Sequence, residues 1–196
     1  IALCEDVNII GTPFYIMSYI EGKVYESILE VELIKDRKDI YLLMVKMLAE
    51  LHNVNYEKLN LAGFGKPSNY AQRQISRWEK QWNLSKQRDI PEMNSIIEWL
   101  NKHLPEKCDS SIVHGDFRLG NLIFNKDSKT INAVLDWELS TIGDPLADFG
   151  YMLYPYYIPF GERHGIKGCN FFIENIPQIN EVIETYCAVR KINIFN

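Results

Sequence analysis

The sequence predicts an α/β (α+β) fold in which long helices enclose a small group of short strands. Apolar residues repeat at helical spacing in several long stretches, and the β-favouring stretches between them are short and bounded by turn residues. The 196 residues are 46% hydrophobic and 24% charged, which suffices for one large domain or two small lobes with a packed core. We find no internal repeat. Along the chain, the predicted elements are first a strand, then helices, then a group of short strands, and then helices again.

The first predicted strand spans residues 14–20, which are rich in aromatic and β-favouring types and end at the turn-forming pair Glu21-Gly22. A long helix is predicted over residues 38–52 because apolar residues recur there at helical spacing, at Ile40, Leu43, Met44, Met47, Leu48 and Leu51. Core packing alone accounts for such a stripe.

Two more helices are predicted in the middle of the chain. A loop with Gly63, Gly65 and Pro67 precedes a helix whose one face carries Ala71, Ile75, Trp78 and Trp82. The next helix ends near Pro105, and its apolar positions are Met93, Ile96, Ile97 and Leu100.

Short extended segments follow, with strands predicted at residues 111–113, 122–124 and 131–135 and a turn at residues 125–128. A helix then begins at Gly143-Asp144-Pro145, because Asp144 is a good N-cap and proline at the first helical position loses no hydrogen bond. The last helix carries Ile179, Val182, Ile183, Tyr186 and Cys187.

Charge and composition exclude several classes of protein. A net charge of −5 argues against a nucleic-acid partner, since such binding relies on clustered Lys and Arg. No apolar run approaches the roughly 18–20 residues that span a bilayer, and no signal peptide opens the chain, so we expect an intracellular protein without a membrane partner. The scattered cysteines are expected to be reduced thiols: Cys4, Cys108, Cys169 and Cys187.

The chemical signal lies in residues 114–121, which read His-Gly-Asp-Phe-Arg-Leu-Gly-Asn. Phosphoryl transfer needs a metal to neutralise phosphate oxygens and a carboxylate to orient the attacking hydroxyl and accept its proton. Asp116 precedes Asn121 by five positions, which is the spacing of kinase catalytic loops. We therefore predict Asp116 as the catalytic base, with His114 ordering the loop by hydrogen bonding.

A second carboxylate follows at Asp136-Trp137-Glu138, at the end of an apolar strand. Asn121 and Asp136 offer the hard oxygen atoms that Mg²⁺ prefers, and they converge if the strands pair. Alone, Asp136 would read as an exposed turn residue. Its combination with the loop motif favours a magnesium site.

Three other patterns compete with this site. Asp148-Phe149-Gly150 resembles the D-F-G metal motif, but Asp148 lies one turn inside a helix rather than after a strand, so we expect it to brace the catalytic loop by accepting backbone hydrogen bonds. The segment of residues 63–66 lacks the remainder of a phosphate-binding loop. His52 and His103 are expected to satisfy carbonyl groups at helix ends.

These residues resemble the aminoglycoside phosphotransferase and choline kinase superfamily, whose signature is H-G-D-x-x-x-x-N, then a strand ending in Asp, then D-P-x-x-D. The matching residues are His114, Asp116, Asn121, Asp136, Asp144, Pro145 and Asp148. The resemblance extends over nearly the whole chain, and residues 4–6, 10–15, 114–122 and 133–147 look like the kinase-like N-terminal domain attached to certain acyl-CoA dehydrogenase family members.

The resemblance implies a protein-kinase-like fold. Residues 1–22 would be the end of the N-lobe and the hinge, and residues 23–196 the helical C-lobe, with catalytic loop 114–121 and metal strand 131–138. The glycine-rich loop and Lys–Glu pair of kinases precede the hinge. Because the chain begins with Ile1 rather than Met, we expect an N-terminally truncated lobe that lacks most of the ATP lid and is inactive in isolation.

The resemblance also implies the nucleotide contacts. Met17 would lie behind the adenine, and the backbone of Ser18, Tyr19 and Ile20 would bind it, although a plain core strand explains these residues too. Further phosphate or substrate contacts are Arg118, Glu138 and Arg73. Arg118 could equally be a surface residue. Trp78 and Trp82 lie on the same predicted helix as Arg73 and could serve only to pack that helix against the body.

The implied activity is transfer of the γ-phosphoryl group of ATP, with Mg²⁺, to the hydroxyl of a small molecule, such as a hydroxyacyl-CoA. Two alternatives remain: a non-catalytic nucleotide-binding or scaffold module, and an amino-alcohol or aminoglycoside kinase. We expect fusion to further domains in the full-length protein. The compartment would be the cytoplasm by default, or the mitochondrion or peroxisome for an acyl-CoA dehydrogenase fusion.

Overall fold

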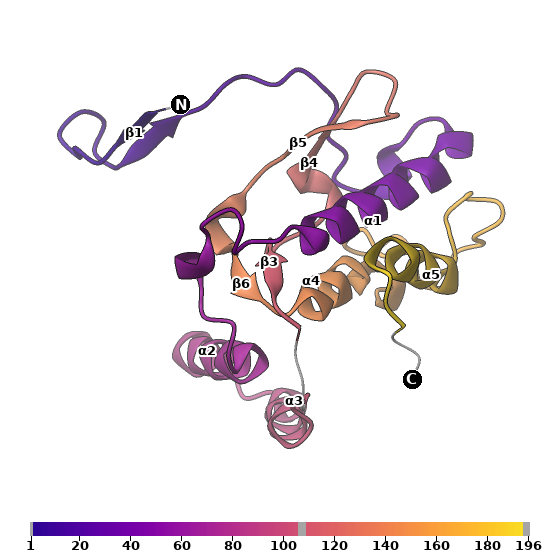
Figure 1. Ribbon diagram of the computed structural model, residues 1–196. Coiled ribbons are helices and arrows are strands. Elements are labelled where there is room, and N and C mark those ends of the chain that lie inside the picture. The colour runs from indigo at the N-terminus through magenta and orange to yellow at the C-terminus, as the bar shows by residue number, and fades with distance from the viewer. Residues whose placement is uncertain (1, 106–108, 194–196) are drawn as a thin grey trace.

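The computed structural model describes residues 2–105 and 109–193 (Figure 1). Its helices are α1 (Arg37–Asn53), α2 (Tyr70–Ser85), α3 (Pro91–Lys102), α4 (Pro145–Met152) and α5 (Ile179–Arg190). Its strands are β1 (Ala2–Cys4), β2 (Phe14–Ile16), β3 (Ser111–Val113), β4 (Leu122–Phe124), β5 (Ile131–Val134) and β6 (Thr141–Gly143). The predicted mixture of long helices and short strands is confirmed.

The strands form three antiparallel pairs, β1 with β2, β3 with β6 and β4 with β5. The prediction of a strand over residues 14–20 was too long, since β2 ends at Ile16, which pairs with Ala2 at the start of β1. The prediction also missed β6. A three-residue strand that ends in glycine is too short to show alternation, and its pairing with β3 supplies the hydrogen bonds.

The β1–β2 hairpin stands away from the helices in Figure 1, and residues 17–22 lead from it to the body of the molecule. The segment first contacts the body at Glu21, whose carbonyl accepts from Asn132 Nδ2 at 3.2 Å, and is then fixed by Lys23. Its backbone N–H donates to the carbonyl of Phe124 at 2.8 Å, and the Phe124 N–H donates back to Lys23 at 2.8 Å. The segment is thereby joined to the end of β4.

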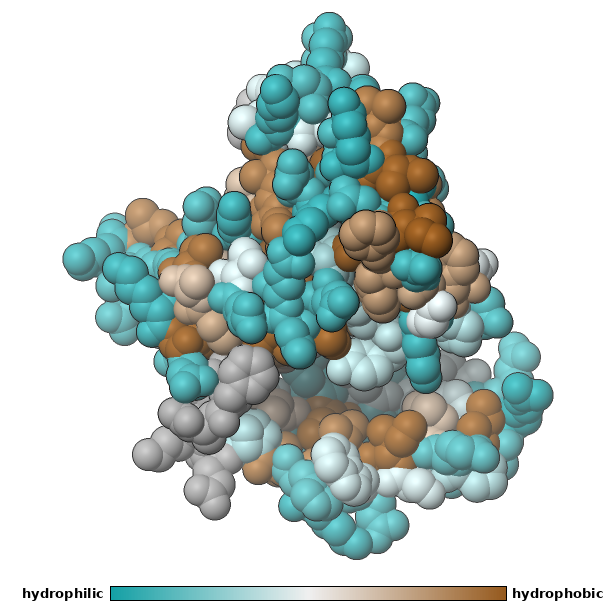
Figure 2. All heavy atoms as spheres, turned by 90° about the vertical axis from the view of Figure 1, so that its right-hand side faces the viewer, coloured by the Kyte–Doolittle hydropathy of each residue, from teal (hydrophilic) through white to brown (hydrophobic). Residues whose placement is uncertain are grey.

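Helix α1 is the centre of the hydrophobic core. The predicted stripe is confirmed, with Ile40, Met44 and Leu48 almost completely buried. It packs mainly against α5 and also against β3, so α1 joins the last helix and one of the strands that flank the loop motif in a single core. On the face in Figure 2, hydrophilic residues separate several small hydrophobic patches.

Helices α2 and α3 form a pair at one side of the body (Figure 1). Tyr70 is buried at the start of α2, whereas Trp78 is 58% exposed, so the predicted apolar face is only partly covered. The three described cysteines, Cys4, Cys169 and Cys187, are free thiols, and Cys108 lies outside the described residues. Among the helices of the described ranges, none is both long and apolar enough to cross a membrane.

Candidate active site

Asp116 and Asn121 lie in one loop between β3 and β4. The Asn121 side-chain amide donates from Nδ2 to Asp116 twice, to its backbone carbonyl at 2.8 Å and to its carboxylate Oδ2 at 3.0 Å. Because Nδ2 is engaged in this way, Oδ1 is the atom of Asn121 that remains available to accept or to ligate. The loop thus fixes the orientation of the carboxylate through a residue five positions later.

The turn before Asp116 requires glycine. Gly115 has a φ of +88°, and a Cβ there would lie 2.8 Å from both the carbonyl oxygen and the Cβ of Leu139. A positive φ is costly for residues with a side chain, and the close approach leaves no room for one. The chain can therefore bring Asp116 beside the segment that follows β5 only with glycine at position 115.

His114 is completely buried and uses both ring nitrogens. Nε2 donates to the carbonyl of Leu135 at 2.8 Å, and Nδ1 accepts from the backbone N–H of Asp116 at 3.3 Å. One nitrogen donates and the other accepts, which describes a neutral imidazole with a fixed tautomer. The geometry gives His114 the role of ordering the loop, because its ring has no solvent-exposed surface from which to exchange a proton.

Asp136 adopts a left-handed conformation, with φ of 64°, at the residue where the chain turns out of β5. The backbone N–H of the preceding residue, Leu135, donates to the carbonyl of Asn121 at 2.8 Å. This bond brings the start of the Asp136 turn to the backbone of Asn121. The side chain of Asp136 is exposed, and so is that of Glu138, which lies in the 3₁₀ turn Trp137–Leu139.

The donor set near this turn fits a hard divalent cation. Asn121 and Asp136 together offer an amide oxygen and a carboxylate, and Mg²⁺ is commonly bound by one or two protein groups together with substrate phosphates. Among the described residues, no group of three or more His, Cys, Asp or Glu side chains is arranged to hold a metal by itself.

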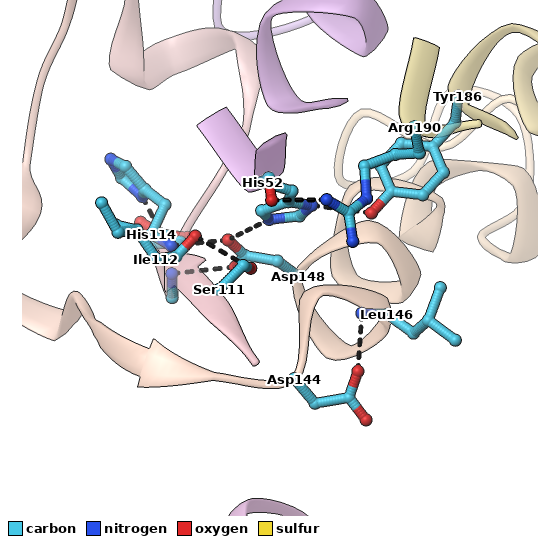
Figure 3. A network of polar contacts seen from close by, with 11 residues as sticks. His52, Ser111, Ile112, His114, Asp144, Leu146, Asp148, Tyr186 and Arg190 are labelled. Carbon is cyan, nitrogen blue, oxygen red and sulfur yellow. Dashed lines mark hydrogen bonds and ion pairs between the residues drawn. The ribbon is translucent and has the colours of Figure 1, made fainter. Parts of the chain in front are cut away.

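Asp148 supports the loop from α4. Its Oδ2 accepts the backbone N–H of His114 at 2.6 Å, and its Oδ1 accepts that of Gly115 at 2.8 Å (Figure 3). Both oxygens of a carboxylate that is only 4% exposed are therefore directed at the turn that precedes Asp116. Asp144 caps the same helix by accepting the N–H of Leu146 at 2.9 Å, so the predicted N-cap is confirmed.

His52 corrects the sequence analysis. It was expected to satisfy carbonyl groups at the end of its helix, but its ring is buried between α4 and α5 (Figure 3). Nε2 lies 3.4 Å from Asp148 Oδ2, and Nδ1 lies 2.7 Å from the hydroxyl of Tyr186. A carboxylate only accepts, so Nε2 carries the proton and Tyr186 donates to Nδ1. His103 does behave as expected, since its Nδ1 contacts the carbonyl of Trp99 at 2.7 Å.

The surroundings of His52 keep it neutral. Burial lowers the pKa of its imidazole below the usual 6.5, and this effect outweighs Asp148, which acts in the opposite direction. Arg190 of α5 donates to the carbonyl of His52 and also lowers the pKa. The result is a continuous buried chain of contacts from α5 through His52 and Asp148 to the catalytic loop.

Arg118 and Tyr151 lie beside the Asp116 carboxylate. Arg118 Nη1 binds Glu26 Oε2 at 2.7 Å, and its Nε is 3.5 Å from Asp116 Oδ2. Partial burial and the interaction with Asp116 raise the pKa of the Tyr151 hydroxyl to about 12. Tyr151 therefore remains protonated and can donate a hydrogen bond to the carboxylate. Sequence reasoning missed Tyr151, because nothing in its local pattern distinguishes it from a helical packing residue.

The remaining predicted residues lie elsewhere. Met17, Ser18, Tyr19 and Ile20 are all exposed in the segment between the hairpin and the body, with Tyr19 at 89%. Arg73 donates to the backbone carbonyl of Lys66, and its guanidinium lies 5.9 Å from the ring centroid of Tyr70. These contacts tie Arg73 to the start of α2, and none of the contacts found for it involves the catalytic loop.

Comparison with known sequences connects this geometry to a family. Residues 1–171 match the model of the phosphotransferase enzyme family. The chain is 42% identical over 188 residues to acyl-CoA dehydrogenase family member 10 of Mus musculus, covering 94% of this chain and 18% of that protein. It is 38% identical over 195 residues to acyl-CoA dehydrogenase family member 11 of Homo sapiens, covering 98% of this chain and 25% of that protein. The chain thus spans 18–25% of the length of these two relatives.

Solved structures agree with the sequence comparison. A crystal structure from Ralstonia eutropha, provisionally assigned as an aminoglycoside phosphotransferase, superposes with a TM-score of 0.91 at 40% identity, covering 100% of this chain and 60% of that one. A macrolide 2'-phosphotransferase type I superposes with a TM-score of 0.60 at 16% identity over 90% of this chain and 53% of that one, a likeness of fold alone. The helical body is therefore a kinase-like fold, and the chain belongs to the phosphotransferase enzyme family.

Proposed function

We propose that this chain carries the catalytic base and the magnesium ligands of an ATP-dependent phosphotransferase that acts on the hydroxyl of a small molecule. The observation that carries the proposal is the Asp116 carboxylate, which Asn121 holds at 3.0 Å within a loop that Asp148 supports. A carboxylate fixed in this way can orient a hydroxyl and accept its proton as the oxygen attacks the γ-phosphorus. The new P–O bond forms as the bond to ADP breaks.

Asn121 and Asp136 would hold Mg²⁺, which when bound neutralises charge on the phosphate oxygens of ATP. Asn121 would use Oδ1, because its Nδ2 donates to Asp116. Its amide would then serve both the metal and the base, so that the two are placed relative to each other by one side chain. Asp136 would contribute a carboxylate that forms no hydrogen bond or ion pair with the described residues.

Residues 1–22 would be the end of an N-lobe and its hinge, and residues 23–196 the C-lobe. The anchoring of Lys23 on Phe124 supports this division, because the exposed segment before it, residues 17–22, has no helix or strand of its own and leads to the body as a hinge would. The backbone of Ser18, Tyr19 and Ile20 would bind the adenine, and Met17 would lie behind it.

The full-length protein would contain further domains, since the matched segment makes up only 18% and 25% of two relatives that are named as acyl-CoA dehydrogenase family members. Those names support a hydroxyacyl-CoA as the acceptor. An aminoglycoside acceptor is supported by the assignment of the Ralstonia eutropha structure.

The test is made in the full-length protein. We expect Mg-ATP to raise its melting temperature, and Asp136→Asn to remove most of the magnesium-dependent part of that increase. Asp116→Ala should lower phosphoryl transfer by about 10²–10⁴-fold, the usual contribution of a general base, with nucleotide binding retained. Asp127→Asn, on the exposed turn after β4, is the matched control. Equal magnesium responses of wild type and Asp136→Asn would remove Asp136 from the metal site.

A further inference from the structure

A pocket of about 160 Å³ opens beside the catalytic loop, between α1 and the segment that follows α4. Its apolar side consists of buried residues from four separate parts of the chain, Ile28, Tyr41, Met44, Leu119 and Met152. Ligand sites for whole small molecules usually measure about 300–1,000 Å³. The pocket therefore fits a short apolar segment of a ligand rather than an entire drug-sized molecule.

Two residues connect this pocket to the proposed base. Arg118 and Tyr151 both line it, and both interact with the Asp116 carboxylate. Asp116 is thus one side chain away from the pocket wall. A hydroxyl group on a molecule that occupies the pocket could reach Asp116 by passing between these two side chains.

The charges around the pocket favour an anion. Glu26 is the one carboxylate among the described residues that line it, and it is already bound to Arg118 at 2.7 Å. Arg163 and His164 also line it, are exposed, and have no hydrogen-bond or ion-pair partner among the described residues. A polycation would meet these basic groups and no unpaired carboxylate, whereas an anionic group would gain a partner.

We propose that this pocket binds the acceptor of the phosphoryl group, and that the acceptor is a hydroxylated molecule with an apolar segment and an anionic group. The apolar segment lies on the side formed by α1 and Met152, the anionic group meets Arg163, and the hydroxyl faces Asp116 between Arg118 and Tyr151. This assignment rests on the proposed function for the identity of the base. It goes further by selecting anionic over cationic acceptors.

The test uses four probes that vary one property at a time in the full-length protein. 6-Hydroxyhexanoate carries the predicted combination, 6-hydroxyhexanamide removes the charge, and 6-aminohexan-1-ol reverses it. Gluconate keeps the anion and the chain length but replaces the apolar segment with hydroxyl groups. Binding is measured by isothermal titration calorimetry without nucleotide, so that the result does not depend on phosphoryl transfer.

We expect 6-hydroxyhexanoate to bind most tightly, 6-hydroxyhexanamide more weakly and 6-aminohexan-1-ol most weakly of these three. Gluconate should bind about tenfold more weakly than 6-hydroxyhexanoate, because its hydroxyl groups would be buried without partners. Arg163→Gln should weaken binding of 6-hydroxyhexanoate about two- to fivefold, the range of an exposed ion pair, and leave the amide unchanged. Arg88→Gln, an exposed arginine outside the pocket, is the matched control and should change neither.

Binding and transfer separate the two proposals. Phosphoester formation from Mg-ATP is followed by ³¹P NMR with the same probes. Arg163-dependent binding without a phosphoester would leave the pocket assignment standing and contradict the reaction. Equal affinity for 6-hydroxyhexanoate, 6-hydroxyhexanamide and 6-aminohexan-1-ol, absence of binding by all three, or a phosphorylated acceptor insensitive to Arg163→Gln would overturn the pocket assignment.

Discussion

The carboxylate of Asp148 accepts the backbone N–H of His114 at 2.6 Å, although the two residues are 34 positions apart in the sequence. The same carboxylate accepts the N–H of Gly115 and contacts the ring of His52. One buried side chain therefore joins α1, α4 and the loop that presents Asp116. Both the stability of the body and the placement of the proposed base depend on this junction.

Asp148→Asn should destabilise the protein by about 3 kcal/mol, because each hydrogen bond to a charged group contributes roughly 1.5–3 kcal/mol and the amide can accept on one side only. Urea unfolding followed by circular dichroism measures the change. Asp144→Asn is the matched control on the same helix, since asparagine caps about as well as aspartate and the free energy of unfolding should change by less than about 0.5 kcal/mol. Equal losses for the two variants would contradict a special role for Asp148.

Tyr186→Phe should cost about 1–3 kcal/mol, the penalty for leaving the buried Nδ1 of His52 without its donor. The phenyl ring keeps its stacking on Phe149, whose centroid is 3.9 Å away, so packing is preserved. Urea unfolding measures this change in the free energy of unfolding. Tyr157→Phe, a substitution at an exposed tyrosine, is the matched control. A loss no larger than that of Tyr157→Phe would show that the hydroxyl contact contributes nothing.

His52 should make stability depend on pH. Burial lowers its pKa in the folded protein below 6.5, so the unfolded chain binds a proton that the folded chain does not. The stability that comes from keeping His52 neutral is fully present above pH 6.5. It is lost as the pH falls from 6.5 to the lower pKa that His52 has in the folded protein. The free energy of unfolding, measured by urea titration between pH 5 and 8, should therefore decrease on the acidic side.

His52→Gln is the variant that isolates this effect, since it replaces the titrating imidazole with a neutral amide that can still donate and accept hydrogen bonds. Its stability should decline less steeply than that of the wild type below pH 6.5. Asp148 and Asp144, which raise the pKa of His52, and Arg190, which lowers it, remain in place. Parallel pH profiles would mean that another group causes the acidic decline.

Gly115→Ala should destabilise by about 2 kcal/mol or more, because a Cβ at this positive φ is strained and would collide with Leu139. Gly150→Ala, within α4, is the control, since its Cβ would meet nothing within 4 Å and alanine favours a helix. Differential scanning calorimetry of both proteins compares them. Equal melting temperatures for the two variants would show that the turn before Asp116 tolerates a side chain.

Local signals in the sequence were sufficient for most of the elements. The apolar stripe over Ile40, Met44 and Leu48 predicted α1, and Asp144 with Pro145 predicted the start of α4, because periodicity and capping act within a few residues. The loop motif was readable for the same reason. Asp116 and Asn121 are five residues apart, so one turn of chain brings the amide to the carboxylate.

Longer contacts could not be read in this way. Tyr186 belongs to an apolar stripe like any other, and only packing of α5 against α1 brings its hydroxyl to His52 across 134 positions. Strand β6 exists because β3 lies beside it, and the pocket beside the loop exists because Arg163, Arg118 and Tyr151 converge from separate segments.

The sequence by itself determined the family, the helices and the loop motif of residues 114–121, since these depend on residue types at short, fixed spacing. The tertiary structure alone decided which buried partners support that loop and which side chains line the neighbouring pocket. The physical reason is that burial, which lowers the pKa of His52, is a property of the packed chain and of no single segment.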